Sequence, residues 1–358
     1  MRVIQFEARP GILDLGWGHP RPELLPTAEW SVAQAEALRV FGWQALTYGY
    51  AAGPSPLTEW LAARHGGSHF VTAGASHALA LLTSLLTKPG DTVLVDAPTY
   101  HLAFPILTDA GLVLESAPAD EDGIDPSRIS SKKAAFLYLV PTFANPTGRS
   151  LPLERRQALI EFADREGLII IEDDTYRDLV YEGTAPPSLW EMAGGHNVIR
   201  IGSFAKTVAP GLRLGWISAT PSLVERLTRL GYVHSGGGVN HTTAVTMAEF
   251  ATSGAYDTHL TRLRDAYRTQ RDALVSALRP HVEVESPAGG WFLWVPLPGD
   301  LLPAAERHGV SFVPGDRFYL PGEGGHDRIR LSFSLLPPAA LTEAATRLIR
   351  LAPPRADR

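Results

Sequence analysis

The sequence predicts an α/β fold with a mostly parallel central sheet, together with a smaller α+β domain. Between Phe70 and Ala219, short apolar runs alternate with helical stretches, which is typical of a parallel sheet covered by helices on both faces. Beyond residue 278, strand and helix candidates are mixed, as in α+β domains. The chain has 358 residues, which exceeds the size at which one hydrophobic core usually stops growing, so we expect two domains.

The N-terminal part is predicted to be an arm. Residues 18–26 are rich in proline, and each proline disfavours helix in the residue before it, so this stretch is predicted to be extended. Residues 47–54 predict a loop, and residues 57–64 predict a short amphipathic helix. The expected parts of the chain are an arm that contributes to the small domain and the active site, residues 1–45, a large domain, residues 46–250, and a long connecting helix with the small C-terminal domain, residues 251–358.

Four apolar runs are the predicted strands of the large domain, and they comprise residues 92–95, 135–140, 168–171 and 198–201. Between the second and third runs, one side of a predicted helix is formed by Ala158, Leu159, Phe162 and Ala163. Ser150 and Pro152 precede this helix and are typical of a helix N-terminus. The two runs and the helix therefore predict a βαβ unit.

The rest of the chain is predicted to connect and complete the two domains. Residues 235–240 are rich in glycine and predict a flexible loop, which is either a mobile lid or a simple connection. Residues 241–278 predict one long helix that links the domains. The small domain is expected to contain strands at residues 291–295 and 329–333 and helices at residues 303–307 and 341–351.

Composition excludes several classes of site. With 38 acidic and 32 basic residues the net charge is −6, so we expect neither nucleic acid nor an anionic membrane as a partner. The absence of cysteine excludes disulfides, thiolate metal sites and cysteine nucleophiles. Residues 1–7 lack the apolar stretch of a signal peptide, and no apolar run has the length of a membrane span. We therefore expect a soluble, cytoplasmic protein.

Polar clusters follow the strand candidates, where open α/β sheets bind their ligands. In the first cluster, Gly74, Ala75 and Ser76 lead into a helix, whose free backbone N–H groups would hold a phosphate; the alternative is an ordinary N-cap by Ser76. The second cluster, residues 141–148, contains the turn-forming pairs Asn145-Pro146 and Thr147-Gly148, so a purely structural turn is the alternative.

The third cluster is Glu172, Asp173 and Asp174, which could bind a divalent cation or present one carboxylate to a protonated pyridine nitrogen. The fourth contains Lys206 and Arg213, and the turn at residues 210–211 would fold the arginine back toward the lysine. A lysine in a semi-buried cleft loses solvation, so its pKa falls and it becomes an amine nucleophile suited to a carbonyl cofactor. The alternative is a pair of solvated surface cations.

Together, in this order, the four clusters resemble fold type I pyridoxal-phosphate enzymes. More narrowly, the chain resembles the class I/II aminotransferase family, in the branch with 2-aminoadipate and multisubstrate aromatic aminotransferases and the effector domains of MocR-type regulators. The resemblance extends from residues 18–20 to residues 330–333. It implies a three-layer PLP-transferase fold, pyridoxal 5'-phosphate as the cofactor of the large domain, and no metal.

The resemblance also implies roles for individual residues. Lys206 would hold the cofactor as a Schiff base and later move a proton between the substrate and the cofactor. Asp173 would pair with the pyridine nitrogen and keep it protonated. Asn145 and Tyr176 would hydrogen-bond the ring oxygen, and Tyr100 would stack on the ring face.

The cofactor phosphate would be bound by Ser203 and Arg213 together with Gly74, Ala75 and Ser76. The family usually has Ser-Gln where this chain has Ala75-Ser76, so the phosphate site lacks a hydroxyl and a side-chain amide, and the cofactor affinity could be reduced.

The substrate would bind beside the cofactor, with its α-carboxylate on Arg330 and with Asn145, Trp17 and Gly18 nearby. Tyr48 matches a tyrosine that reaches the phosphate of the neighbouring subunit's cofactor, which implies a homodimer with shared active sites. The substrates would be an amino acid and a 2-oxo acid.

Further departures from the family pattern and weaker candidates remain. Ala144 replaces a common glutamine or histidine, and Trp291 stands where methionine is frequent. Trp17, Trp291 and Phe318 either line an apolar substrate pocket or pack in the core. His65 and His69 have a spacing that could bind metal on a helix, but two glycines between them argue against one, and we expect surface histidines.

These observations favour an aminotransferase that works by a ping-pong cycle. The alternatives are other cofactor-dependent reactions of amino acids, such as β-elimination or decarboxylation, and a sensor domain of a transcription regulator. We expect the regulator to be the weaker alternative, because only a short arm precedes the cofactor domain and the chain lacks a basic face.

Overall fold

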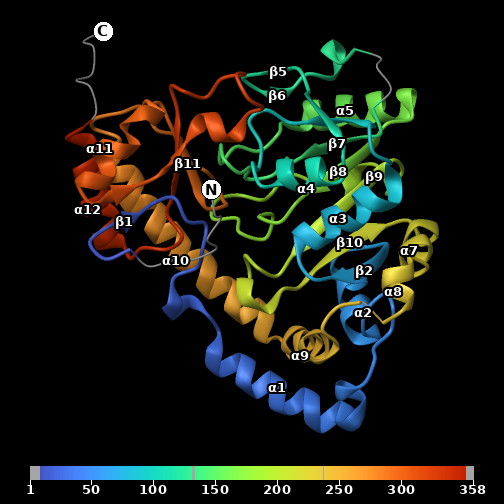
Figure 1. Cartoon of the computed structure of the whole chain (residues 1–358). Coiled ribbons are helices and arrows are strands. Elements are labelled where there is room, and N and C mark those ends of the chain that lie inside the picture. Colours follow the sequence, from blue (N-terminus) through green and yellow to red (C-terminus); the bar gives the residue numbers. More distant parts are fainter. Residues whose placement is uncertain (1–8, 131–133, 237, 352–358) are drawn as a thin grey trace.

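A computed structural model describes residues 9–130, 134–236 and 238–351. Its centre is a seven-stranded sheet with the strand order β2-β10-β9-β8-β7-β3-β4 (Figure 1). In this sheet β10 runs antiparallel to both of its neighbours, and the other neighbouring pairs are parallel, so the predicted mostly parallel sheet is confirmed. The strands are β2 (Ser68–Thr72), β3 (Thr92–Val95), β4 (Val113–Ser116), β7 (Phe136–Leu139), β8 (Ile169–Asp173), β9 (Val198–Ser203) and β10 (Gly215–Ala219).

The two faces of the sheet are covered by different helices, as alternation of side chains along a buried strand requires. On β7, Phe136 and Tyr138 belong to a core cluster with α3 and α4, whereas Leu137 and Leu139 pack with α5 and α6. Layers of helix, sheet and helix result, which confirms the predicted three-layer arrangement. The covering helices are α3 (Ala75–Leu86), α4 (Ala103–Asp109), α5 (Leu153–Glu166), α6 (Leu189–Met192), α7 (Pro221–Thr228) and α8 (Gly231–His234).

A second, smaller sheet lies in the C-terminal part, where β14 pairs antiparallel with β11 and β13. The N-terminal arm joins this part, because its short strand β1 pairs in parallel with β12. The strands predicted at residues 291–295 and 329–333 are present as β11 and β14, and the helices predicted at residues 303–307 and 341–351 are present as α11 and α12. The elements are β1 (Leu13–Asp14), β11 (Phe292–Val295), α11 (Leu302–Arg307), β12 (Val310–Ser311), β13 (Val313–Pro314), β14 (Ile329–Ser332) and α12 (Pro338–Ile349).

The predicted single long helix over residues 241–278 is wrong, because it is two helices, α9 (His241–Thr252) and α10 (Ala255–Leu278). Gly254 between them has φ +84°, a left-handed conformation that ends the first helix and that glycine adopts readily. Helix α10 then runs from the large domain to α12 of the small one (Figure 1).

The arm contains one helix that the sequence analysis did not predict. Residues 18–26 are mostly irregular, as predicted, but α1 (Thr27–Phe41) follows them and packs on α9. The predicted short helix is present as α2 (Ser55–His65). The remaining short elements are η1 (Pro22–Leu24), η2 (Gly42–Leu46), β5 (Ala119–Asp120), β6 (Gly123–Ile124), η3 (Pro126–Arg128), η4 (Pro210–Leu212), η5 (Gly299–Leu301) and η6 (Gly315–Phe318).

The prediction that His65 and His69 lie on the surface is wrong, because both are buried. The ring of His65 stacks on Trp216 with centroids 5.3 Å apart, and Nδ1 of His69 lies 3.1 Å from the hydroxyl of Ser218. Burial lowers the pKa of His65 to about 2 and that of His69 to about 4, so both rings are neutral and act as packing groups.

Within the described ranges, no helix combines the length and the apolar character that a membrane span needs. Residues 1–7, on which the signal-peptide expectation depends, lie outside the described residues.

Candidate active site

The predicted polar clusters converge at one edge of the large sheet. Strands β7, β8 and β9 are parallel, and β2 has the same direction because the antiparallel β10 lies between β2 and β9. The register places Gly215 opposite both Thr72 and Ser203. The carboxyl ends of these strands therefore lie together, where an open α/β sheet binds its ligand.

Lys206 lies at this edge, three residues after β9 ends at Ser203. Its ammonium is 4.8 Å from the centroid of the Trp291 ring and 5.6 Å from that of Tyr176. Burial lowers the pKa of Lys206 to about 8, although the Asp173 carboxylate opposes this shift. The surface-cation alternative is thus wrong for Lys206, whereas Arg213 is exposed.

Asp173 ends strand β8 and is buried. The hydroxyl of Tyr138 donates a hydrogen bond of 2.8 Å to its Oδ2. Among the described residues Oδ1 has no partner with hydrogen-bond geometry, although Thr175 lies near enough to lower the pKa of the carboxyl. Burial outweighs both neighbours and raises the pKa of Asp173. An acceptor oxygen is therefore buried at the site with no donor in the described part of the chain.

Strand alternation separates Asp173 from Glu172 in the Glu172-Asp173-Asp174 cluster. Glu172 accepts backbone hydrogen bonds of 2.9 Å from the first residues of α6, on the opposite face from Asp173. Asp174 lies 2.9 Å from the guanidinium of Arg200. The acids do not converge, and the described residues contain no group of three His, Cys, Asp or Glu side chains that could hold a metal ion.

Arg330 brings the small domain to the site. It lies on β14, is buried, and donates a hydrogen bond of 2.8 Å from Nη1 to the side-chain oxygen of Asn145. Its Nη2 donates to the carbonyl of Gly16 in the arm, and its guanidinium lies 4.3 Å from the centroid of the Phe292 ring and 5.0 Å from that of Phe318. Burial lowers the pKa of Arg330 to about 10, and among the described residues its Nε has no partner.

The two predicted tyrosines belong to the same cluster. Tyr176 is buried beside the Asn145 side chain, and burial raises the pKa of its hydroxyl far above the ordinary value. Burial also raises the pKa of Tyr100 to about 12, with a further contribution from Asp173 and an opposing one from Arg330. Both hydroxyls therefore keep their protons and remain available as hydrogen-bond donors.

The predicted phosphate site lies at the N-terminus of α3. Gly74 is the N-cap of this helix, and Ser76 lies inside the helix, so the N-cap alternative for Ser76 is wrong. A guanidinium nitrogen of Arg213 donates to the carbonyl of Ala73 at 3.3 Å. Ser203 is buried nearby and Ser76 is exposed. The helix N-terminus, the cation and the hydroxyl form a site that suits an anion.

Replacing Gly74 by alanine is expected to weaken phosphate binding. Gly74 has φ +94°, and a Cβ atom there would lie 2.8 Å from Nη2 of Arg213, so the guanidinium must move. We expect the dissociation constant for pyridoxal phosphate to rise by about tenfold, in line with the loss of one charge-assisted hydrogen bond. Gly211→Ala is the matched control, since a Cβ atom at Gly211 would have no atom of the described residues within 4 Å. Equal affinities of both variants, measured by fluorescence titration, would contradict this assignment of the phosphate site.

The aromatic candidates have different positions. Trp291 is fully buried against Lys206, and Phe318 is fully buried under Arg330, so both support charged site residues as well as the core. Gly18 packs on Phe292, where an added Cβ atom would lie 3.0 Å from the ring, and Trp17 is partly exposed beside it. Tyr48 lies apart, because it is 84% exposed and packs near Gly236.

Sequence reasoning missed two contributors to the site. Tyr138 could have been found from strand alternation, because it pairs with Ile171, which is two residues before Asp173 on the same face. The second contributor is the carbonyl of Gly16, which accepts a hydrogen bond from Arg330. The two residues are more than three hundred positions apart in the sequence, so no local pattern indicates their contact.

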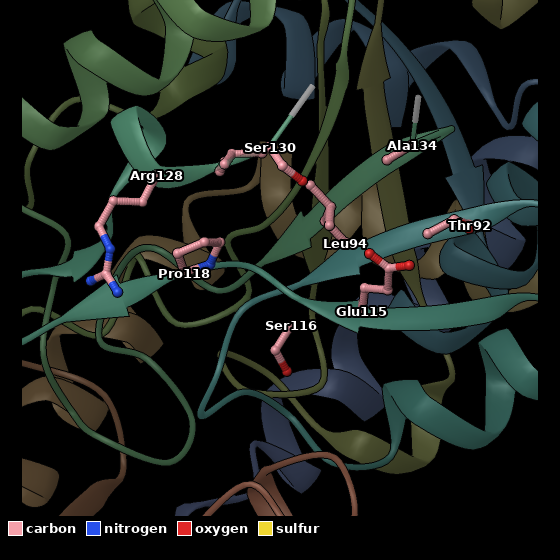
Figure 2. Close-up of a pocket in the computed structure, with 9 residues that line it drawn as sticks. Thr92, Leu94, Glu115, Ser116, Pro118, Arg128, Ser130 and Ala134 are labelled. Atoms are coloured by element: carbon pink, nitrogen blue, oxygen red, sulfur yellow. The ribbon is translucent and has the colours of Figure 1, made fainter. Parts of the chain in front are cut away.

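A separate pocket of about 100 Å³ lies beside the edge strand β4 (Figure 2). It is lined by Thr92, Leu94, Glu115 and Arg128, among others. Leu94 belongs to the core on the α5 and α6 face, opposite to the face of Tyr138. The pocket is therefore not part of the site around Lys206.

The site fits pyridoxal phosphate in three respects. Asp173 Oδ1 is a buried acceptor without a donor in the described part of the chain, which suits a protonated ring nitrogen. Lys206 is a desolvated amine with a lowered pKa, which suits attachment to an aldehyde. Gly74 has no side chain, so an anion can approach the backbone there next to the Arg213 guanidinium.

Comparisons with known proteins agree with this geometry. A family model described as "Aminotransferase class I and II" matches residues 12–348. A 2-aminoadipate transaminase of Thermus thermophilus is 34% identical over 371 residues, covering 97% of this chain and 92% of the relative. An uncharacterised HTH-type transcriptional regulator of Bacillus subtilis is 31% identical, covering 93% of this chain and 72% of the relative.

A solved structure gives the same result. The α-aminoadipate aminotransferase of Thermus thermophilus, in complex with N-(5'-phosphopyridoxyl)-L-leucine, has a TM-score of 0.86 and 33% identity, with 96% of this chain and 92% of that chain covered. The chain belongs to the class I and II aminotransferase family, the pyridoxal-phosphate-dependent transaminases of fold type I.

Proposed function

We propose that this enzyme moves the amino group of an L-amino acid to a 2-oxo acid by a ping-pong cycle, with the residues around Lys206 as its active site. The observation that supports this most is a desolvated Lys206 amine, packed against the rings of Trp291 and Tyr176, whose pKa is influenced by both the Asp173 carboxylate and the Arg330 guanidinium. An amino acid presents the matching groups, because its carboxylate suits the guanidinium and its amino group lies on the adjacent carbon.

Each residue has a task that its position supports. When bound, pyridoxal phosphate would take up the amino group and withdraw electrons from the substrate α-carbon. Asp173 would hold the proton of the ring nitrogen, and Lys206 Nζ would remove and return the α-proton. Asn145 and Tyr176 would donate hydrogen bonds to the ring oxygen, and Tyr100 would stack on the ring.

Substrate and phosphate contacts complete the proposal. Arg330 would bind the substrate carboxylate with two parallel hydrogen bonds, and Trp17 and Gly18 would border the substrate from the arm. The phosphate would lie between Arg213, Ser203 and the backbone at residues 74–76. The pairing of β1 with β12 supports the proposal that the arm belongs to the small domain. We propose that the arm comprises residues 1–45, the large domain residues 46–250, and the C-terminal part residues 251–358.

Steady-state kinetics test the proposed reaction. Initial rates measured against a panel of amino acids at several fixed concentrations of a 2-oxo acid should give parallel double-reciprocal lines, because one product leaves before the second substrate binds. Lines that intersect would contradict the ping-pong cycle. Consumption of amino acid that does not depend on any 2-oxo acid would instead support β-elimination or decarboxylation.

A homodimer is the second part of the proposal. The segment after α1 exposes a group of large apolar side chains, namely Trp43, Leu46, Tyr48 and Tyr50, each between 73% and 84% exposed. Such a group is typical of a surface that another chain covers. We propose that a second copy of this chain covers it and that Tyr48 reaches the cofactor phosphate of the partner subunit. A cytoplasmic location is also proposed and can be tested by cell fractionation.

Replacing Leu46 by aspartate is expected to weaken the proposed dimer. Burying a carboxylate without a partner opposes association by several kcal/mol, so the dimer dissociation constant should rise by about 100-fold or more. Leu153→Asp is the control, because Leu153 is exposed outside this group and an acid in the first turn of α5 is compatible with the helix dipole. Sedimentation equilibrium should show a monomer for the Leu46 variant alone. A wild-type monomer at micromolar concentration would contradict the dimer.

A further inference from the structure

Tyr138 lies behind the proposed cofactor position and takes no direct part in the proposed cycle. It is fully buried on β7, and the register pairs it with Ile171 of β8, on the face where Asp173 lies two residues further along. Its hydroxyl donates to Asp173 Oδ2 at 2.8 Å. The other oxygen, Oδ1, is the one without a donor in the described part of the chain.

These contacts give the two oxygens of Asp173 different tasks. A carboxylate at the end of a strand can rotate about its side-chain bonds, and only one orientation presents a free oxygen to a ligand. The Tyr138 hydrogen bond fixes Oδ2 and thereby leaves Oδ1 available. We propose that Tyr138 is a positioning residue, which aims Oδ1 of Asp173 at the ring nitrogen of pyridoxal phosphate and holds the carboxylate in its ionised form.

The chemistry of the pair supports this role. A hydrogen bond donated to a carboxylate stabilises the charged form, and a charged acceptor strengthens that bond. Burial and the neighbouring Asp173 charge raise the pKa of the Tyr138 hydroxyl far above its ordinary value, so the hydroxyl keeps its proton and stays a donor. Without this donor, a carboxylate buried on an apolar face would more readily take up a proton itself. A neutral Asp173 could not hold a proton on the ring nitrogen.

Packing accounts for the ring of Tyr138 but not for the hydrogen bond that its hydroxyl donates to Asp173. The ring lies in the core with Val95, Phe136 and Ile171, which phenylalanine would serve equally well. A buried hydroxyl without a task lowers stability, since it loses its hydrogen bonds to water. The hydroxyl is therefore explained by its contact with Asp173.

Equilibrium binding of two cofactors tests the inference, which rests on the proposed use of pyridoxal phosphate. Tyr138→Phe should weaken binding of pyridoxal phosphate by about tenfold or more, the effect expected for one hydrogen bond to a charged group. It should change the affinity for 1-deazapyridoxal phosphate, which has carbon in place of the ring nitrogen, by less than about twofold. The two losses of affinity, for pyridoxal phosphate and for its deaza analogue, form a double-mutant cycle, and their ratio measures the coupling between Tyr138 and the ring nitrogen. General damage to the site would weaken both cofactors equally and give no coupling.

Tyr267→Phe is the matched control. Tyr267 is also fully buried, but within the described ranges its hydroxyl has no hydrogen-bond partner, so its removal should leave both affinities unchanged. Near-equal weakening of both cofactors by Tyr138→Phe, or no weakening of either, would overturn the inference. Failure of the wild-type protein to bind pyridoxal phosphate at all would instead overturn the proposed function, so the two failures can be told apart.

Discussion

Lys206→Ala is expected to lower kcat of transamination by at least about 1000-fold, because it removes both the amine that holds the cofactor and the base that moves the α-proton. The variant should also lose the visible absorbance of the lysine-bound cofactor. The structure supports this expectation through the lowered pKa of Lys206 and its place between Trp291 and Tyr176. Lys88→Ala is the control, since Lys88 is exposed and should be replaceable without loss.

The lowered pKa of Lys206 also predicts how the rate of cofactor capture changes with pH. Only the neutral amine attacks an aldehyde, and with a pKa of about 8 its fraction rises steeply between pH 7 and pH 9. Covalent capture of pyridoxal phosphate by the cofactor-free protein should therefore accelerate over this range and then level off. A turnover of Lys206→Ala close to that of the wild-type protein would contradict the assigned role.

Arg330→Lys is the second large effect that we expect. Arginine offers a carboxylate two parallel donors, whereas lysine offers a single point charge, so the substitution is not conservative at such a site. Buried charge pairs that lose one partner typically lose about 2–5 kcal/mol, and about 1.4 kcal/mol corresponds to about tenfold, so kcat/KM for amino acids should fall by about 30-fold or more. The effect should appear mainly in KM, because the carboxylate is held in both the ground state and the transition state.

Two controls separate loss of carboxylate binding from general damage at this site. Arg328→Lys changes a partly exposed arginine just before β14 and should leave kcat/KM unchanged. The half-reaction with a primary amine that lacks a carboxylate is expected to be slow in the wild-type enzyme and should not become slower in Arg330→Lys. An equal loss with amino acids and with such amines would show that Arg330 supports the fold of the site and does not bind the substrate carboxylate.

Much of the fold could be predicted because its signals are local. The strands of the sheet are short apolar runs, and the helix over residues 153–166 has a clear apolar side. The break at Gly254 was missed because one glycine inside a helical pattern is often tolerated, and only the positive φ shows that the chain turns there. Helix α1 was missed because the prolines of residues 18–26 predict an extended arm, and no helix was expected directly after them.

The site itself was predictable only in part. Strand ends indicated Asp173 and Lys206, since parallel strands place their carboxyl ends at one edge. Contacts across long separations were not predictable from spacing, as the 185 residues between Asn145 and Arg330 illustrate. Choosing among the three acids at the end of β8 required the two-residue alternation of the strand, which assigns Asp173, and not its neighbour Glu172, to the face of Tyr138.

One measurement tests the central claim, that Lys206 holds a cofactor which accepts and returns amino groups. Borohydride treatment of the holoenzyme followed by peptide mass mapping should find a phosphopyridoxyl group on Lys206. Incubation with an effective amino acid before reduction should remove this label from Lys206, and later addition of a 2-oxo acid should restore it. A label on Lys88, Lys132 or Lys133, or a label on Lys206 that no amino acid in a broad panel removes, would contradict the account.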